Sequence, residues 1–288
     1  MSRNCAFLTL EDRSGFCIYD HLLCAPLANV GWTAVEIPWN RPDVKWATFE
    51  VVIIRSTWDY QKTPEQFLST LEAIEGVTTL YNPVAICRWN LNKRYLRDLQ
   101  DRGVPIVPTY WLERLDEASL AALFSESAAP RLVAKPLVGA NADDAFVLKS
   151  RETGSWVEAL RVFTDREVMV QPFVDSIVSE GEYSLFYFGG RLSHAILKRP
   201  AAGDFRVQEE HGGIIAPVTP HEDLVRAGNQ AIAAIGTTLL YARVDLVRLA
   251  SGQPALMEME LIEPSLYFDQ DPNSAAIFAE EFTRMVGG

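Results

Sequence analysis

The feature that most limits how this 288-residue chain can fold is LMEMELIEP, Leu256–Pro264, an apolar run that contains three glutamates. In an extended strand, side chains alternate between two faces, so Glu258 and Glu260 share one face and Met257 and Met259 share the other. Two carboxylates about 7 Å apart on one half-buried face repel each other and are costly to desolvate. The stretch therefore predicts a strand whose polar face binds a positive charge.

The composition is that of a globular protein with one large domain or two to three small ones, since 48% of the residues are apolar and 22% are charged. No run approaches the roughly 18 apolar residues of a membrane span, and the apolar stretch near the N-terminus is too short for a signal peptide. We therefore expect a cytoplasmic protein without a membrane partner. The formal charge of −12 argues against nucleic acid as the main partner. Four scattered cysteines and four scattered histidines argue against a disulfide, a zinc site or a histidine-based metal site.

Strand and helix patterns alternate through the first 80 or so residues. The strand patterns cover 5–10, 33–38 and 50–55, and a helix pattern covers about 19–30. A second helix begins after Thr63, with Pro64 at its first position and Gln66 at the capping-box position. This order predicts a small α/β unit with a mostly parallel sheet.

The rest of the chain favours antiparallel strands. Helix patterns cover 90–102, which ends at Gly103, and then 116–125, 221–235 and 273–286. Strand patterns cover 131–136, 145–149, 167–171, 182–188, 191–198, 240–249 and 255–262. The FGGR sequence at 188–191 predicts a hairpin turn. We therefore expect two α+β portions after the α/β unit.

A third carboxylate, Asp245 in YARVDLVRL, lies on the strand that precedes the glutamates in a predicted hairpin. With Glu258 and Glu260 opposite, three carboxylates converge, and such oxygen ligands suit Mg²⁺ held jointly with phosphate oxygens. The alternative is an edge strand with solvated glutamates. Apolar residues on the opposite face and on both flanks favour the metal.

Three lysines can supply the cations that a phosphate needs. Lys93 lies at the start of a predicted helix, where backbone N–H groups also favour anions. Lys135 lies at the end of RLVAKP, and Lys198 at the end of SHAILK. Each alone is typical of a surface lysine whose stem packs on its neighbours. Together with the acidic hairpin, they favour a nucleotide site.

The order and spacing of these motifs resemble the ATP-grasp superfamily. The motifs are Lys93, VAKP with Lys135, VQPFV at 170–174, EGEYS at 180–184, GDFRVQEEHGG at 203–213, RVDL at 243–246 and LMEMELIEP. The chain is similar in particular to the glutathione synthetase and ribosomal-protein glutamate ligase branch. Through VVIIRSTWDY and ELIEPSLYF it resembles still more the O-ureidoserine cyclo-ligase group of cycloserine biosynthesis. The resemblance covers nearly the whole chain.

The resemblance implies an α/β and α+β chain with the ATP-grasp fold, in three parts. These are an N-terminal, small parallel α/β domain over 1–88, a linker helix and lid over 89–174, and a C-terminal, mainly antiparallel subdomain with the metal over 175–288. ATP and Mg²⁺ would bind between the last two parts. In relatives the lid loop is rich in Gly and Ser, whereas here it reads PLVGANADDAF, and the N–H groups of Gly139 to Ala142 are expected to cradle phosphates.

Roles for individual side chains follow from the same resemblance. It implies Lys93, Lys135 and Gly139 as phosphate contacts, Gln171, Pro172, Phe173 and Val174 as the adenine hinge, and Glu182 as the ribose contact. It implies Asp245, Glu258 and Glu260 as Mg²⁺ ligands, although relatives usually have Asn at the position of Glu260. Arg206 would stabilise the transferring phosphoryl group, with Lys198 as the second catalytic residue.

Substrate contacts are expected around RSTWDY, because ligands of open α/β sheets bind where strands end. Arg55 can pair with a substrate carboxylate and Asp59 with an ammonium group, with Ser56 beside them. The alternative is a structural Arg–Asp pair. Glu263, together with Ser265 and Tyr267 after it, is expected to line the same cleft.

The activity implied by the resemblance is an ADP-forming ligase that joins a small-molecule carboxylate to an amine through an acyl-phosphate. In the cyclo-ligase version, both groups belong to one amino-acid-like molecule. A non-catalytic ATP sensor and a small-molecule kinase of the same fold are the alternatives. Arg206 and the carboxylate set argue against the sensor, because binding alone needs neither. The resemblance is compatible with a homodimer.

Overall fold

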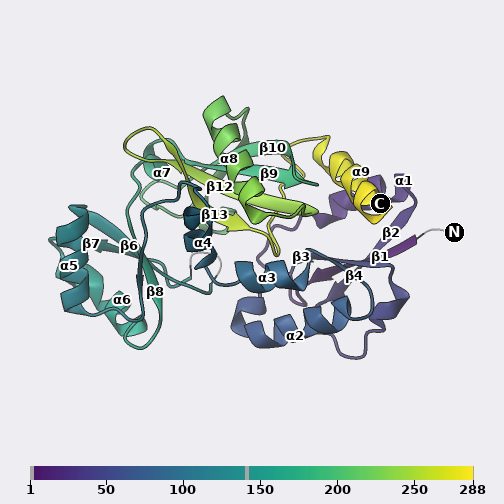
Figure 1. Cartoon of the computed structure of the whole chain (residues 1–288), viewed down its shortest axis with the longest axis horizontal. Coiled ribbons are helices and arrows are strands. Elements are labelled where there is room, and N and C mark those ends of the chain that lie inside the picture. The colour runs from purple at the N-terminus through teal and green to yellow at the C-terminus, as the bar shows by residue number, and fades with distance from the viewer. Residues whose placement is uncertain (1–2, 140–142, 288) are drawn as a thin grey trace.

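Three sheets organise the chain in a computed structural model that describes residues 3–139 and 143–287 (Figure 1). The first sheet is parallel, in the order β2–β1–β3–β4, which confirms the predicted α/β unit. Its strands are β1 (Arg3–Thr9), β2 (Trp32–Pro38), β3 (Val51–Ser56) and β4 (Thr79–Tyr81).

The central strands β1 and β3 are buried on both faces, because they are apolar at successive positions. Cys5 and Phe7 of β1 pack with α1 (Cys24–Asn29) and the C-terminal helix α9 (Ser274–Val286). Ala6 and Leu8 pack with α2 (Pro64–Glu75) and α3 (Val84–Asn90) on the other side. Helices on both faces of a parallel sheet are the expected arrangement for such strands.

The second sheet is antiparallel and lies at the far end of the molecule from the N-terminus (Figure 1). Its order is β5–β8–β6–β7, and its strands are β5 (Tyr110–Leu112), β6 (Arg131–Pro136), β7 (Phe146–Lys149) and β8 (Val168–Pro172). Two helices, α5 (Glu117–Ser127) and α6 (Val157–Val162), share a separate hydrophobic core with it. We call this unit the lid sheet.

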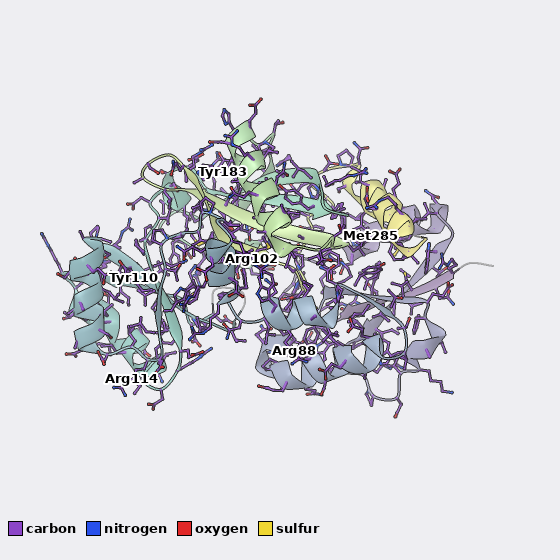
Figure 2. The ribbon with its side chains drawn as sticks, viewed as in Figure 1. Arg88, Arg102, Tyr110, Arg114, Tyr183 and Met285 are labelled. Carbon is purple, nitrogen blue, oxygen red and sulfur yellow. The ribbon has the colours of Figure 1, made fainter. Side chains whose placement is uncertain are left out.

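The third sheet is antiparallel and forms the centre of the molecule. Its order is β11–β10–β9–β12–β13, and its strands are β9 (Glu182–Phe188), β10 (Arg191–Arg199), β11 (Ile214–Pro217), β12 (Tyr241–Arg248) and β13 (Pro254–Glu260). The remaining helices are α4 (Tyr95–Asp101), α7 (Ser176–Ser179) and α8 (Glu222–Ile235). Arg102, labelled in Figure 2, donates from Nη1 to the Ala234 carbonyl at 2.7 Å and so connects the end of α4 to α8.

Buried polar groups join the first sheet to the third. The Tyr241 hydroxyl lies 2.7 Å from the carbonyl oxygen of Ile54 and 2.8 Å from that of Ile262. The Asn82 amide nitrogen donates to the carbonyls of Tyr241 at 2.9 Å and Leu261 at 2.7 Å. Because unpaired buried polar groups are costly, these contacts hold the two sheets in one relative position.

Two local predictions are wrong. The expected helix over 90–102 is interrupted between Asn90 and Tyr95, because the backbone N–H of Lys93 donates to the Leu137 carbonyl at 2.8 Å instead of continuing a helix. The helix that begins at Pro64 lacks the predicted capping box, since the Thr63 side chain makes no cap hydrogen bond. A capping box forms instead between Asp116 and Ser119 at the start of α5.

Within 3–139 and 143–287, no helix combines the length and the apolar character that crossing a bilayer requires.

Candidate active site

A cleft lies where the three sheets meet. The first sheet's end contributes Trp58 and Tyr60, the lid sheet contributes Val133 and Lys135, and the third sheet contributes strands β9, β10, β12 and β13. The residues expected at a nucleotide and substrate site that line it are Lys93, Lys135, Gly139, Gln171, Pro172, Phe173, Val174, Glu182, Lys198, Arg206, Asp245, Glu258, Glu260, Glu263 and Ser265. Side chains more than 150 residues apart in sequence thus reach one cavity.

The β12–β13 hairpin brings the three predicted acidic ligands together. Asp245 is the direct antiparallel partner of Glu258, and Arg243 is the direct partner of Glu260. Directly opposed residues lie on the same face of an antiparallel pair. The pairing shifts after Asp245, where a β-bulge places Leu246 opposite Leu256. All three carboxylates therefore face the cleft.

Lys93 supplies one of the positive charges that the glutamate pattern requires. Its Nζ donates to Glu258 Oε1 at 2.7 Å and to the Gly139 carbonyl at 3.0 Å. Burial alone would lower the pKa of Lys93, but Glu258 together with Glu260 and Glu263 raises it. Burial alone would raise the pKa of Glu258, but Lys93 together with Lys135 lowers it.

Arg243 and Lys198 supply the other positive charges. The Arg243 guanidinium donates to both Asp245 oxygens, at 3.1 Å from Nε and 3.0 Å from Nη2, and its Nη2 also bonds Glu260 Oε1. Lys198 Nζ lies 2.5 Å from Glu182 Oε1 and 3.4 Å from Asp245 Oδ1. Burial opposes ionisation of Asp245, yet the two cations hold the pKa of Asp245 below its ordinary value.

Two carboxyls near the first sheet have raised pKa values. Desolvation raises the pKa of Glu260 to about 7, although Arg243 opposes the increase. Desolvation and the neighbouring Glu260 raise the pKa of Glu263 to about 8, although a hydrogen bond with the Tyr60 hydroxyl opposes it. This end of the cleft thus holds carboxyls that are less compensated by cations than Asp245 or Glu258.

The acidic residues fit a magnesium ion that is shared with phosphate oxygens, and they do not form an all-protein cage. Among the residues that the structure describes, no group of three His, Cys, Asp or Glu side chains is arranged to hold a metal ion. Asp245 and Glu258 are paired across the hairpin, and one or two carboxylates are the usual protein contribution to such a site. Their oxygen donors match Mg²⁺, and a lysine lies within 4 Å of each, Lys93 beside Glu258 and Lys198 beside Asp245.

The hinge segment lies at the other end of the cleft, against the lid sheet. Val174 packs in one hydrophobic cluster with Met257 of β13. Phe173 lies under the Arg131 guanidinium, 3.8 Å from the ring centre. Apolar and aromatic walls of this kind accommodate a flat heterocycle.

Lys135 extends from β6 into the cleft between the hinge and Glu258. Its nearest hydrogen-bonding partner is Met257 Sδ at 3.6 Å, and no carboxylate of the described residues lies within 4 Å of its Nζ. Burial lowers the pKa of Lys135, and Glu258 opposes the decrease. A half-buried ammonium without an anion is the arrangement expected of a phosphate ligand. The other proposed phosphate cradle, Gly139 to Ala142, lies outside the described residues except for Gly139.

Arg206 lies in the connection between β10 and β11 and borders the cleft. Its Nη2 donates to Asp204 Oδ2 at 2.8 Å, and its side chain is 38% exposed. The neighbouring Phe205 ring lies 6.3 Å from Phe173, in an edge-to-face contact. Arg206 is therefore a half-exposed cation whose only ion-pair partner among the described residues is on its own loop.

Arg55, Ser56 and Asp59 are not brought to the cleft. Arg55 is buried and forms an ion pair with Asp20 at 2.8 Å, and it also donates to the Pro264 carbonyl at 3.2 Å. Asp59 accepts a hydrogen bond from Trp39 Nε1 at 2.7 Å. The structure therefore favours the structural alternative for these residues. Their neighbours Trp58 and Tyr60 line the cleft instead.

Arg243 is a cleft residue that the motif spacing does not identify. It stands two residues before Asp245 in YARVDLV, so strand alternation alone places both on one face. Tyr267, which is expected beside Ser265, also lines the cleft.

Comparisons with known proteins agree along most of the chain. Residues 5–82 match the family model described as the N-terminal domain of D-cycloserine synthetase DcsG. The cycloserine biosynthesis protein DcsG of Streptomyces lavendulae is 33% identical in an alignment 270 residues long, which covers 87% of this chain and 88% of that protein. The crystal structure of D-cycloserine synthetase DcsG superposes with a TM-score of 0.86 at 31% identity, over 98% of this chain and 99% of that one.

A more distant structure shares the fold. The ATP-grasp ligase PsnB, solved with a variant of its minimal precursor, Mg and ADP, matches with a TM-score of 0.69 at 14% identity. The match covers 99% of both chains.

Proposed function

The chain belongs to the family of D-cycloserine synthetase DcsG, within the ATP-grasp ligases, and from this membership we propose that it closes a ring in an amino-acid-like molecule. The predicted ATP-grasp fold is confirmed, and so is the class of enzyme, an ADP-forming ligase that makes a C–N bond. The substrate that the sequence resemblance implies is O-ureidoserine. Its carboxylate would be activated by ATP and then attacked by a nitrogen of the same molecule.

ATP would lie between the lid sheet and the third sheet. The apolar walls at Phe173, Val174 and Met257 suit the adenine, and the backbone of Gln171–Val174 is the hinge that would read its edge. Glu182 is the proposed ribose contact. Lys93 and Lys135 reach the middle of the cleft, where they would bind the phosphates.

Magnesium would be held by Asp245 and Glu258, with Glu260 as the third predicted ligand. When bound with ATP, the metal neutralises phosphate charge and orients the terminal phosphoryl group. Lys93, which bonds Glu258, would then turn to the phosphates.

Transfer requires the substrate carboxylate to attack the terminal phosphoryl group in line. Arg206 and Lys198 would stabilise the negative charge that is shared between the attacking and leaving oxygens. The acyl-phosphate that forms is then attacked by the substrate nitrogen, phosphate leaves, and a C–N bond closes the ring. The protein would position the reacting atoms, because side chains from the parts of the chain that carry all three sheets line one cleft.

The observation that carries this proposal is the placement of Lys135, Lys93 and Glu258 side by side in a cleft with an apolar hinge at one end. This placement puts two proposed phosphate ligands beside a proposed metal ligand, and activation of a carboxylate by ATP requires both. A small-molecule carboxylate and amine are the proposed partners. A cytoplasmic location is proposed as well, since the enzyme uses ATP.

Release of ADP and phosphate should be measured with O-ureidoserine and with a panel of amino acids and their derivatives, singly and in pairs, in the presence of MgATP. Stoichiometric ADP and phosphate from O-ureidoserine alone would support ring closure. Release only with a second, separate amine would indicate an intermolecular ligase. ADP without free phosphate would indicate a kinase, and tight ATP binding without turnover would indicate a sensor.

A further inference from the structure

The loop that carries Arg206 is bonded to a distant part of the chain through Glu209. This loop covers 200–213, between β10 and β11. The Tyr19 hydroxyl donates to the Glu209 carboxylate and lies 3.2 Å and 3.3 Å from its two oxygens. Tyr19 stands 190 residues earlier in the chain, in the segment between β1 and α1. Glu209 and Cys17, two residues before Tyr19, both line the cleft, so the contact joins two of its borders.

Tyr267 is the second tyrosine at this carboxylate. Its ring centre lies 5.9 Å from that of Tyr19. Burial raises the pKa of Glu209, and hydrogen bonds from the Tyr19 and Tyr267 hydroxyls oppose the increase. Burial and the Glu209 charge raise the pKa of Tyr19, so its hydroxyl remains a donor at neutral pH. We call Tyr19, Glu209 and Tyr267 the Glu209 bridge.

The Tyr267 end of the bridge is firmly placed. Tyr267 is 6% exposed, and its backbone φ of +45° is uncommon for an aromatic residue. The Leu266 carbonyl before it accepts a hydrogen bond from the His194 ring at 3.0 Å, and that ring stacks on Phe186 with 4.3 Å between ring centres. A backbone of this kind persists where the surrounding contacts fix it. Tyr267 therefore gives Glu209 a fixed neighbour.

The loop itself is compact, so a restraint on Glu209 extends to Arg206, three residues earlier. Asp204 Oδ1 accepts from the backbone N–H of Arg206 at 3.0 Å, and Asp204 Oδ2 accepts from its Nη2 at 2.8 Å. Val207, between Arg206 and Glu209, is 5% exposed. After Glu209 the chain turns back, and the N–H of Gly212 donates to the Glu209 carbonyl at 2.8 Å. The position of Glu209 therefore limits where the Arg206 guanidinium can lie.

We propose that the Glu209 bridge positions Arg206 for catalysis, holding the 200–213 loop so that the guanidinium meets the terminal phosphoryl group of ATP as the substrate carboxylate attacks. The inference rests on the proposed function and adds three positioning residues to it. Tyr19, Tyr267 and Glu209 act through Arg206 and not on the reacting atoms. Because a displacement of about 1 Å can lower a rate about 100-fold, two hydroxyl contacts at the base of the loop can affect kcat.

The double variant Tyr19→Phe with Tyr267→Phe removes both hydroxyls and keeps both rings. With O-ureidoserine and MgATP, its kcat should be about 10-fold lower than that of the wild type. Its Kd for ATP should change less than about 2-fold, because Arg206 acts mainly in the transition state. Tyr183→Phe is the matched control and should keep the wild-type kcat. It removes a hydrogen bond of 2.7 Å from a tyrosine to Glu180, outside the residues that line the cleft (Tyr183 is labelled in Figure 2).

The same double change in an Arg206→Ala background separates positioning from a general loss of stability. If the bridge acts through Arg206, the two hydroxyls should matter less than about 2-fold for kcat once Arg206 is absent. Glu209→Gln, which keeps an oxygen acceptor for the tyrosines, should retain more of the wild-type kcat than Glu209→Ala.

Amide hydrogen exchange of the nucleotide-free protein tests the bridge without turnover. In the Tyr19→Phe, Tyr267→Phe variant, the amides of 204–213 should exchange about 10-fold faster than in the wild type, because the loop has lost its outside contact. The amides of β1 and β9 should exchange at the wild-type rate. Faster exchange throughout the chain would indicate a structural role for the tyrosines and would overturn the inference.

Three further results would overturn the inference while the proposed function stands. They are a wild-type kcat in the double variant or in Arg206→Ala, an equal loss of kcat from the double change with and without Arg206, and unchanged exchange of 204–213. If the wild type releases no ADP with O-ureidoserine, the proposed function fails by itself. The exchange of 204–213 then decides whether the bridge holds the loop, and unchanged exchange refutes it.

Discussion

Lys93 Nζ lies 2.7 Å from Glu258 Oε1, so the proposed phosphate ligand and the proposed metal ligand neutralise each other across the cleft. The pair is partly buried, with 15% and 32% of the two side chains exposed. Arrival of MgATP would give each partner a counter-charge of its own. The nucleotide therefore replaces an existing interaction, and its net binding energy is smaller than the sum of the new contacts.

Glu258→Gln should lower turnover about 100-fold or more, because a neutral amide is a weak ligand for Mg²⁺. Stability without nucleotide should change by about 1 kcal/mol or less, since the pair is partly exposed and Lys93 keeps its bond to the Gly139 carbonyl. ADP release and thermal unfolding measure the two effects. A variant with normal Mg²⁺-dependent turnover would remove Glu258 from the metal site.

Lys135→Met should weaken ATP binding by about 1.5–3 kcal/mol, the usual contribution of a charged hydrogen bond. The free protein should be as stable as the wild type, because Lys135 has no carboxylate within 4 Å among the residues described. Calorimetry should compare the Kd for ATP of the wild type with those of Lys135→Met and of a control variant, Lys149→Met. Lys149 lies in the same sheet but is exposed and pairs with Glu152, so its loss should leave ATP affinity unchanged.

Arg206→Ala should lower kcat roughly 100-fold or more, because its donors would bind the phosphoryl oxygens more strongly in the transition state than in bound ATP. The Kd for ATP should change little, and so should the melting temperature, since the side chain is 38% exposed. Arg199→Ala, a neighbouring exposed arginine outside the cleft, is the control. If ATP affinity falls while kcat is retained, Arg206 is a contact of the ground state only.

Arg55→Met should destabilise the protein by about 3–5 kcal/mol, because Asp20 would remain as an uncompensated buried charge. The double variant Arg55→Met with Asp20→Asn should recover a large part of this loss. Urea unfolding at neutral pH gives both values. If the single and double variants have equal free energies of unfolding, the unpaired charge of Asp20 is not the cause of the destabilisation.

Glu263→Gln should be more stable than the wild type at pH 8 by about 1–3 kcal/mol, the scale of an uncompensated buried polar group. The pKa of Glu263 is raised from 4.5 to about 8 by burial and by Glu260. Between these values the unfolded chain releases the proton and the folded chain retains it, so the stability of the wild type falls as pH rises. Glutamine resembles the protonated form and does not titrate.

The advantage of Glu263→Gln should therefore grow from pH 5 to pH 8, in protein free of ATP and Mg²⁺. Unfolding at four pH values in this window tests the trend. A constant difference between the two proteins would mean that Glu263 does not titrate in this range.

Much of the cleft could be predicted from the sequence, because strand alternation is a strong constraint. The prediction that Asp245 faces Glu258 needs only two strands and a short turn, and the register confirms it. Arg55 could not be placed in this way. Its partner Asp20 is 35 residues away, in a short 3₁₀ helix before α1, and whether an arginine at a strand end faces a cleft or a core depends on that packing.

The interruption before α4 also has a cause that no local pattern reveals. Lys93 leaves the helix because its backbone bonds the Leu137 carbonyl, 44 residues later in the chain, and its side chain bonds Glu258. Helix propensity reports the first few neighbours only, so a tertiary hydrogen bond overrides it. The short strands β4 and β5, three residues each, are below the length at which alternation is visible.

The hydrogen bonds of Tyr241 and Asn82 between the first and third sheets have a consequence for how the molecule opens. The carbonyls of Ile54, Tyr241 and Leu261 would lose these partners if the two sheets separated, so the sheets should open as one cooperative unit. The lid sheet has a hydrophobic core of its own. Amide hydrogen exchange should then divide the chain into two levels of protection instead of three, with one shared level for β1–β3 and β9–β13 and a lower one for β5–β8.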